Sequence, residues 1–151
     1  MSEPLHVVCP SCGTTNRVQP AQLGSEPSCG KCRQALFEGR PVALDESAFE
    51  RQVARSELPV LVDFWAAWCG PCRAMAPAYE QAARMLEPHV RVAKVDTEQA
   101  QALAARLNIR SIPTLALFMG GREVARQPGA LTRAEDIARW ARGQMAAHSP
   151  A

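Results

Sequence analysis

Residues 60–72 read VLVDFWAAWCGPC, an apolar segment that runs into a Cys-Gly-Pro-Cys turn. The first six residues are nearly all apolar, which predicts a short buried strand over 60–65. Cys69 and Cys72 follow where this strand gives way to a helix. A thiol at a helix N-terminus lies among unpaired N–H groups and the positive end of the helix dipole, and both favour the thiolate. The spacing therefore predicts a cysteine pair that opens and closes a disulfide.

Helix and strand patterns alternate around this segment. Before it, a Ser-x-x-Glu capping box at Ser47 and Glu50 predicts the start of a helix. After it, we expect a helix over 72–86 that contains Pro77 as a kink, and then a strand over 90–95. A strand–helix–strand unit of this kind requires a parallel pair of strands with a right-handed crossover.

The remaining part of the chain predicts a helix, a hairpin and a last helix. In chain order we expect a helix that starts at residues 96–99, a strand over 114–119, a Gly120-Gly121 turn, a strand over 123–127, and a helix opened by a capping box at Thr132 and Glu135. The hairpin adds antiparallel strands to the parallel pair. The fold class is therefore α/β, with a central mixed sheet flanked by helices.

Length and composition limit the function classes. The chain has 151 residues, of which 47% are hydrophobic and 21% charged, so it can build an ordinary core. A net charge of +2 gives no reason to expect nucleic acid or a membrane as a partner. The first residues hold no basic segment followed by an apolar one, and no apolar run approaches about 18 residues. We therefore expect a cytoplasmic protein whose six cysteines are reduced, metal-bound or catalytic.

Four of the cysteines form a second set near the N-terminus: Cys9, Cys12, Cys29 and Cys32. The two C-x₂-C pairs are separated by 16 residues, which is the spacing of a zinc site. Four thiolates complete a tetrahedral Zn²⁺ without an open position, so one structural zinc is expected, with Gly13 and Gly30 relieving the backbone of the two turns. Two disulfides or an iron centre remain alternatives.

The two cysteine sets suggest the domain organisation. We expect a zinc ribbon over 1–39, a second domain over 40–147 and a flexible tail over 148–151. The front segment has little apolar periodicity, so it needs the metal in order to fold. His6, His89 and His148 have no ligand or catalytic spacing and are expected at the surface.

Three motifs together resemble the thioredoxin family: VDFWAAWCGPC at 62–72, IPT at 112–114, and Gly129-Ala130. The resemblance covers about residues 45 to 145. With the cysteine-rich front segment included, the chain is similar to the zinc-containing bacterial thioredoxins of the thioredoxin 2 type. This resemblance implies a thioredoxin fold and a thiol-disulfide oxidoreductase that reduces protein disulfides.

Four residues are expected to carry the chemistry: Cys69, Cys72, Asp63 and Lys94. Cys69, at the helix start, is the attacking thiolate, and Cys72, one turn into the helix and more buried, is the resolving thiol. Asp63 has apolar neighbours, and burial would raise its pKa enough to relay a proton to or from Cys72. The resemblance implies the same buried acid and gives it Lys94 as a partner. The alternatives are a static disulfide or half a metal site for the cysteine pair, a solvent-facing Asp63, and an ordinary exposed Lys94.

The resemblance also implies a surface where substrates dock. The bond before Pro113 would be cis and would face the disulfide, which leaves backbone groups free to pair with an extended segment. A flat apolar surface would surround Cys69, formed by Trp68, Gly70, Pro71, Ile112, Pro113, Gly129 and Ala130. Trp65 and Trp140 are expected in the core. Arg73 and Pro128 are mild departures from the family pattern, and Pro128 lies at the rim of this surface.

The function expected from these residues is a protein-disulfide reductase that cycles between a Cys69/Cys72 dithiol and a disulfide. By resemblance, thioredoxin reductase would recharge it, protein disulfides would be its substrates, and it would act as a monomer. A zinc-dependent binding module or holdase that uses the second domain as a scaffold is the alternative. The Gly-Pro dipeptide and the missing signal segment disfavour an oxidase or isomerase.

Overall fold

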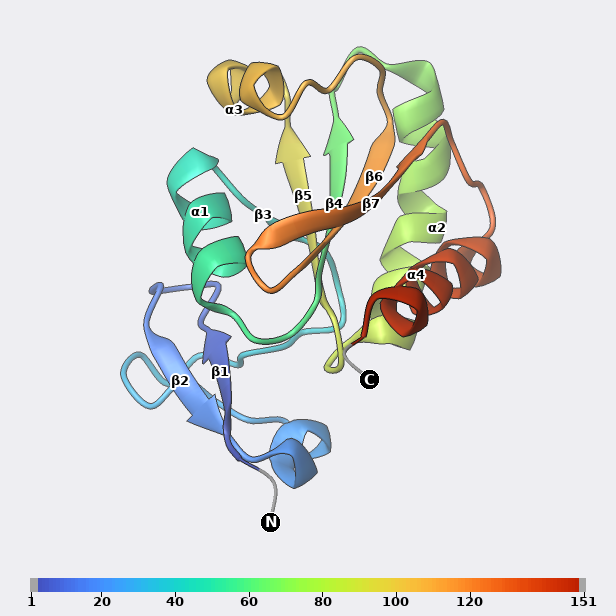
Figure 1. The fold of residues 1–151 in the computed structure, drawn as a ribbon. Helices are drawn as coiled ribbons and strands as arrows, with labels where there is room; N and C mark the ends of the chain where they lie inside the picture. Colours follow the sequence, from blue (N-terminus) through green and yellow to red (C-terminus); the bar gives the residue numbers. More distant parts are fainter. Residues whose placement is uncertain (1–2, 150–151) are drawn as a thin grey trace.

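A computed structural model describes residues 3–149, which form a small ribbon domain beside a five-stranded sheet covered by helices (Figure 1). Residues 1–2 and 150–151 lie outside the described residues; the first two belong to the N-terminal segment in which no signal sequence is expected, and the last two belong to the expected tail. Within the described part, no helix is long and apolar enough to cross a membrane.

The ribbon domain is an antiparallel hairpin followed by a short helix and a loop. Strands β1 (Leu5–Val8) and β2 (Thr15–Val18) pair with Leu5 opposite Val18, and the 3-10 helix η1 (Pro20–Ser25) follows. The ribbon domain has a small apolar core of its own, which the sequence pattern did not predict. Its buried members include Val7, Val18, Leu23 and Leu36, and Leu58 of the second domain packs with them.

The second domain is built on a mixed sheet with the strand order β3-β5-β4-β6-β7. Its strands are β3 (Val42–Ala43), β4 (Val60–Trp65), β5 (Arg91–Asp96), β6 (Thr114–Met119) and β7 (Arg122–Pro128). The first three pair in parallel, and β6 and β7 add antiparallel pairs. This arrangement confirms the α/β class and the central mixed sheet.

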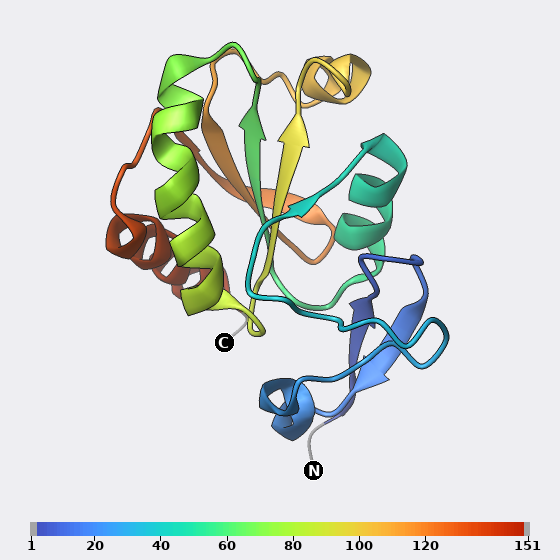
Figure 2. The same cartoon turned by 180° about the vertical axis from the view of Figure 1, so that it is seen from behind.

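Four helices cover the two faces of the sheet: α1 (Glu46–Arg55), α2 (Gly70–Leu86), α3 (Gln101–Arg106) and α4 (Ala134–His148). Helices α2 and α4 lie on one face, and α1 and α3 lie on the other (Figures 1 and 2). Alternate side chains of a strand point to opposite faces. On β4, Leu61 packs with α2 and α4 whereas Val62 packs with α1. Asp63 therefore points toward α2.

Three helix starts differ from the predicted ones. Helix α1 is capped by Asp45, whose carboxylate accepts the Ala48 N–H at 2.8 Å, so the Ser47 capping box is wrong. Helix α4 begins after Arg133 without any side-chain cap from Thr132. The segment after Asp96 first forms a turn, in which Asp96 accepts the Glu98 N–H, and α3 starts only at Gln101. The Asp45 carboxylate moves the start of α1, and the turn after Asp96 delays the start of α3.

The C-terminal end of the chain is helical further than expected. Helix α4 continues to His148, and the Ser149 hydroxyl donates to the Met145 carbonyl at 2.6 Å. Trp140 is half-buried and packs against the core between α2 and α4.

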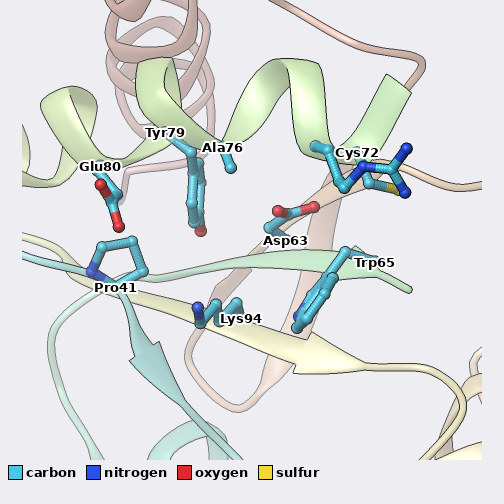
Figure 3. Close-up of a pocket in the computed structure, with 9 residues that line it drawn as sticks. Pro41, Asp63, Trp65, Cys72, Ala76, Tyr79, Glu80 and Lys94 are labelled. Carbon is cyan, nitrogen blue, oxygen red and sulfur yellow. The ribbon is translucent and has the colours of Figure 1, made fainter. Parts of the chain in front are cut away.

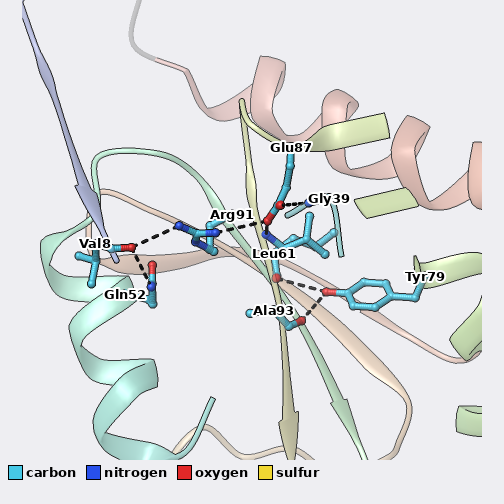
Figure 4. Close-up of polar contacts among 9 residues, drawn as sticks. Val8, Gly39, Gln52, Leu61, Tyr79, Glu87, Arg91 and Ala93 are labelled. Carbon is cyan, nitrogen blue, oxygen red and sulfur yellow. Dashed lines mark hydrogen bonds and ion pairs between the residues drawn. The ribbon is translucent and has the colours of Figure 1, made fainter. Parts of the chain in front are cut away.

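A buried polar cluster joins the ribbon to the second domain, and we call it the Arg91 cluster (Figure 4). The Val8 carbonyl of β1 accepts from Arg91 Nη2 and from Gln52 Nε2, both at 3.2 Å. Arg91 also pairs with Glu87 at 3.5 Å, and its guanidinium lies 4.5 Å from the centre of the Phe37 ring. The side chains of Arg91 and Glu87 are only 1% and 2% exposed, so the ribbon covers a charged pair of the second domain.

Candidate active site and metal centre

The redox cysteines lie at the start of α2, where the chain leaves β4. Cys69 is the N-cap of the helix and forms a disulfide with Cys72, and its Sγ accepts the Cys72 N–H at 3.2 Å. A sulfur in this position receives helix N–H groups that stabilise the thiolate once the disulfide opens. The two residues are 4% and 3% exposed, so exposure does not separate their roles as expected.

Their surroundings do separate the two cysteines. Cys69 Sγ lies 3.7 Å from the Ile112 carbonyl oxygen, next to the cis Ile112–Pro113 bond. Cys72 instead lines a cavity of about 90 Å³ beneath α2, together with Asp63. Cys69 therefore lies beside the segment with the cis proline, whereas Cys72 and the buried acid line the same cavity.

Asp63, which lines the cavity beside Cys72, is the buried acid of the described sheet strands (Figure 3). Asp63 is 5% exposed, and its Oδ1 has no hydrogen-bond partner among the described residues. Burial raises the pKa of Asp63 to about 7, although the Lys94 charge acts in the opposite direction. One water needs roughly 10–15 Å³ of such space, so the cavity that the carboxyl and Cys72 both line has room for several waters.

Lys94 and Trp65 form further walls of the cavity. Lys94 of β5 is the register partner of Asp63, so the two side chains leave neighbouring strands on the same face. The Lys94 ammonium lies 5.4 Å from the centre of the Trp65 ring. Trp65 is half-buried, and its Nε1 is buried without a hydrogen-bond partner in the described chain. Trp65 is thus a cavity wall rather than a plain core residue.

The residues expected to bind substrate lie around Cys69 at the same end of the sheet. Trp68 is 67% exposed, and its indole N–H donates to Glu98 at 2.7 Å. Gly70 and Pro71 are exposed in the first turn of α2, and Ile112 packs against the cysteines.

The other members of this surface follow β7. The Gly129 N–H donates to the Pro113 carbonyl at 2.9 Å. Gly129 has φ +94°, a backbone conformation that favours glycine at this position. Ala130 is exposed beside it. Pro128 is the last residue of β7 and pairs in register with Thr114 of β6, so it belongs to the sheet. No pattern in the sequence indicated that the Glu98 carboxylate would hold the Trp68 ring.

The four N-terminal cysteines come together at one end of the ribbon. Their Sγ atoms all lie within 4.8 Å of one another, with 3.6 Å between Cys9 and Cys32 and between Cys12 and Cys29. A tetrahedral zinc with bonds of about 2.3 Å places its sulfurs about 3.8 Å apart. Backbone N–H groups of Ser11 and Lys31 point at Cys9 and Cys29, at 3.3 and 3.4 Å. Such donors stabilise thiolates, so the cluster fits Zn²⁺.

The two cysteine turns use their residues differently from the expectation. Gly13 has φ +79° and donates its N–H to the Cys9 carbonyl at 3.0 Å. In the second turn the equivalent residue is Arg33, with φ +71° and an N–H to the Cys29 carbonyl at 2.9 Å. Gly30, which was expected to relieve this turn, does not have a positive φ among the described backbone angles. In each turn, the residue with a positive φ is therefore the one directly after the C-x₂-C pair.

Comparison with known proteins agrees with this geometry. Residues 40–142 match the family model described as Thioredoxin. The chain belongs to the thioredoxin family. Residues 8–34 match a second model, described as the N-terminal domain of thioredoxin 2, which is a zinc ribbon. The expected family and the expected fold are therefore confirmed.

Individual relatives match between 58% and 92% of the chain. Thioredoxin C-3 of Corynebacterium nephridii is 47% identical over 139 residues, which cover 92% of this chain and 94% of the relative. Thioredoxin 1 of Nostoc sp. is 46% identical over 88 residues, covering 58% of this chain and 82% of the relative. A mutant thioredoxin from Halobacterium salinarum superposes with a TM-score of 0.63 at 28% identity, covering 72% and 93% of the two chains. The chain is a thiol-disulfide oxidoreductase that reduces protein disulfides, with a zinc site in its ribbon.

The raised pKa of Asp63 predicts how this protein's stability depends on pH. The folded state keeps the Asp63 proton up to about pH 7, whereas an unfolded aspartate loses it near its ordinary value of 3.8. The free energy of unfolding should therefore fall between pH 4 and 7, and Asp63→Asn should remove that fall. At pH 8 the substitution should stabilise the protein by roughly 4 kcal/mol.

Urea unfolding of the two proteins from pH 4 to 8 measures this difference. Glu135→Gln, which removes an exposed acid on α4, is the matched control and should leave the pH dependence unchanged. A pH dependence that is identical in wild-type and Asp63→Asn proteins would contradict the raised pKa.

Proposed function

We propose that Cys69 and Cys72 carry out the reduction and that Asp63 takes up the proton of Cys72. The Cys69 thiolate attacks a substrate disulfide, so a Cys69–substrate disulfide forms and one substrate thiolate leaves. Cys72 then passes its proton through water to the Asp63 carboxylate and attacks Cys69 Sγ. The second substrate thiolate leaves, and two electrons have moved from the dithiol to the substrate.

One observation carries this division of roles: of the two cysteines, Cys72 shares the cavity with the buried acid, and Cys69 lies at the Ile112 carbonyl. A holdase or a scaffold would need neither the disulfide nor a carboxyl group with a pKa near neutrality. We assign Lys94 the role of moderating the pKa of Asp63, because its charge favours the carboxylate.

The remaining assignments concern binding and location. A substrate would dock on the surface around Cys69, with an extended segment beside Pro113 and a broad contact with Trp68. One structural Zn²⁺ would be held by the four ribbon cysteines, residues 1–39 and 40–147 would behave as ribbon and catalytic domain, and the tail expected over 148–151 would begin only after the end of α4 at His148. Thioredoxin reductase would restore the dithiol of a monomer in the cytoplasm, where zinc thiolates and a reducing dithiol persist.

Asp63→Asn tests the proton transfer. The variant should slow release of the reduced substrate by about a hundredfold at pH 7, because general-base assistance is lost, while the first attack by Cys69 keeps its rate. Stopped-flow measurement of Trp fluorescence resolves the two steps with a disulfide substrate in excess. Glu135→Gln should leave both rates at the wild-type values. Equal slowing of both steps, or slowing of neither, would refute the role of Asp63.

A further inference from the structure

Tyr79 lies in the wall of the Asp63 cavity, although nothing in the sequence pattern singled it out. It follows Cys72 by two helical turns, so both side chains lie on the same face of α2 and point toward the sheet. Tyr79 is 2% exposed, and Figure 3 shows its ring beside the Asp63 carboxyl, with the hydroxyl directed toward the strands. A buried hydroxyl group costs free energy unless it is hydrogen-bonded.

The Tyr79 hydroxyl bonds to the backbone of both strands that carry the acid and the lysine (Figure 4). It lies 2.5 Å from the Ala93 carbonyl oxygen and 3.2 Å from the Leu61 carbonyl oxygen. Ala93 immediately precedes Lys94 on β5, and Leu61 is two residues before Asp63 on β4. Burial holds the pKa of Tyr79 well above its ordinary value, so the hydroxyl keeps its proton and can donate it to these carbonyls.

We propose that Tyr79 is a positioning residue for the proton transfer: its hydroxyl neutralises the two carbonyl dipoles beside the cavity and so favours ionisation of Asp63. The inference rests on the proposed role of Asp63 as proton acceptor. Without the hydroxyl, the Ala93 and Leu61 oxygens would lose this donor and keep more partial negative charge close to the buried carboxyl group. Tyr79 thus acts through Asp63, and it does not exchange a proton with the substrate.

The other groups around Asp63 do not replace this contribution. Lys94 of β5 is the cation that favours the carboxylate, and Cys72 of α2 is the proton donor. Arg73 and Glu80 of α2 also line the cavity, but both residues are exposed and carry opposite charges. Solvent screens exposed charges, so the buried hydroxyl remains the group that compensates the carbonyls.

Tyr79→Phe tests the proposal because it keeps the ring and removes only the hydroxyl. The pKa of Asp63, followed by NMR through its carboxyl carbon, should rise above the wild-type value. A rise of about one would lower the ionised fraction at pH 7 about fivefold, so release of the reduced substrate should slow by about two- to fivefold. At pH 9 the carboxyl is ionised in both proteins, and the two release rates should converge.

Two controls separate this role from a merely structural one. Ser56→Ala deletes another buried hydroxyl, at the end of α1, and should change neither the pKa of Asp63 nor the release rate. The double variant Tyr79→Phe/Asp63→Asn should release substrate no more slowly than Asp63→Asn alone, since Tyr79 acts only through the acid. Thermal unfolding of each variant shows whether it is fully folded at the temperature of the rate measurements.

The outcomes distinguish this inference from the function on which it rests. A normal release rate in Asp63→Asn would overturn the proton acceptor itself. Slow release in Asp63→Asn together with an unchanged or lowered pKa of Asp63 in Tyr79→Phe would overturn only the role of Tyr79. Slowing by Tyr79→Phe that persists at pH 9, or that adds to the effect of Asp63→Asn, would also overturn it, because the effect would then be structural.

Discussion

Cys72→Ser should accumulate disulfide-linked complexes with substrate proteins, whereas Cys69→Ser should form none and should lose disulfide reduction. The reason is the different environment of the two sulfurs. Cys69 caps α2 at the Ile112 carbonyl, where a substrate can reach it, and Cys72 faces the Asp63 cavity. Without Cys72 nothing resolves the Cys69–substrate bond, so the complex persists.

Non-reducing electrophoresis after incubation with a disulfide-bonded protein measures the complexes, and an insulin-reduction assay measures turnover. The double variant Cys69→Ser/Cys72→Ser is the control for complexes formed through the ribbon cysteines, and it should trap nothing. Trapping by Cys69→Ser with free Cys72 would reverse the assignment of the two thiols.

Removal of zinc should unfold the ribbon while the catalytic domain stays folded. Apparent zinc binding to small metal-dependent domains is worth about 10–16 kcal/mol at neutral pH, and without it the few buried apolar side chains of the ribbon do not outweigh the conformational entropy lost when its chain is ordered. The catalytic cysteines, Asp63 and the sheet lie outside the ribbon, so disulfide reduction should continue. We expect residues 42–147 alone to fold and to keep this activity.

Hydrogen exchange of the full chain, with and without a chelator, measures this effect. Amide protection should disappear over β1 and β2 and should remain in β4 and β5, and metal analysis should give one zinc per chain before chelation. Peroxide treatment adds a second readout: zinc release that precedes oxidation of Cys69 and Cys72 would indicate a redox-sensitive ribbon. Protection of β1 that survives complete metal removal would contradict the structural role of zinc.

The sequence predicted those features that depend on local spacing. The strand before Cys69, the helix after it and the two C-x₂-C turns could be predicted, because each is determined by residues close together in the chain. The Asp63 site was predicted as well, since a carboxylate within an apolar strand is conspicuous. Helix starts were harder to predict where two nearby side chains could both accept the first helix N–H groups. Helix α1 is an example, because Asp45 caps it and Ser47 does not.

Features that depend on contacts between distant segments could not be predicted. Tyr79 belongs to the apolar face of a helix, and only the fold shows that its hydroxyl reaches the Ala93 and Leu61 carbonyls. Arg91 opens an apolar strand, where a charged residue is normally exposed at the edge. Its burial follows from the ribbon, 83 positions away at Val8, which no local pattern encodes.

The Arg91 cluster also determines how the two domains come apart. Most domain contacts hide apolar surface, and separation then leaves a sticky patch that favours aggregation. Here the central contact is a charged pair and a shared carbonyl, and each of these groups hydrates well when it is uncovered. Separation would also uncover Leu58, which packs in the ribbon core, but the rest of this contact would leave polar groups that hydrate on the catalytic domain rather than a continuous apolar patch.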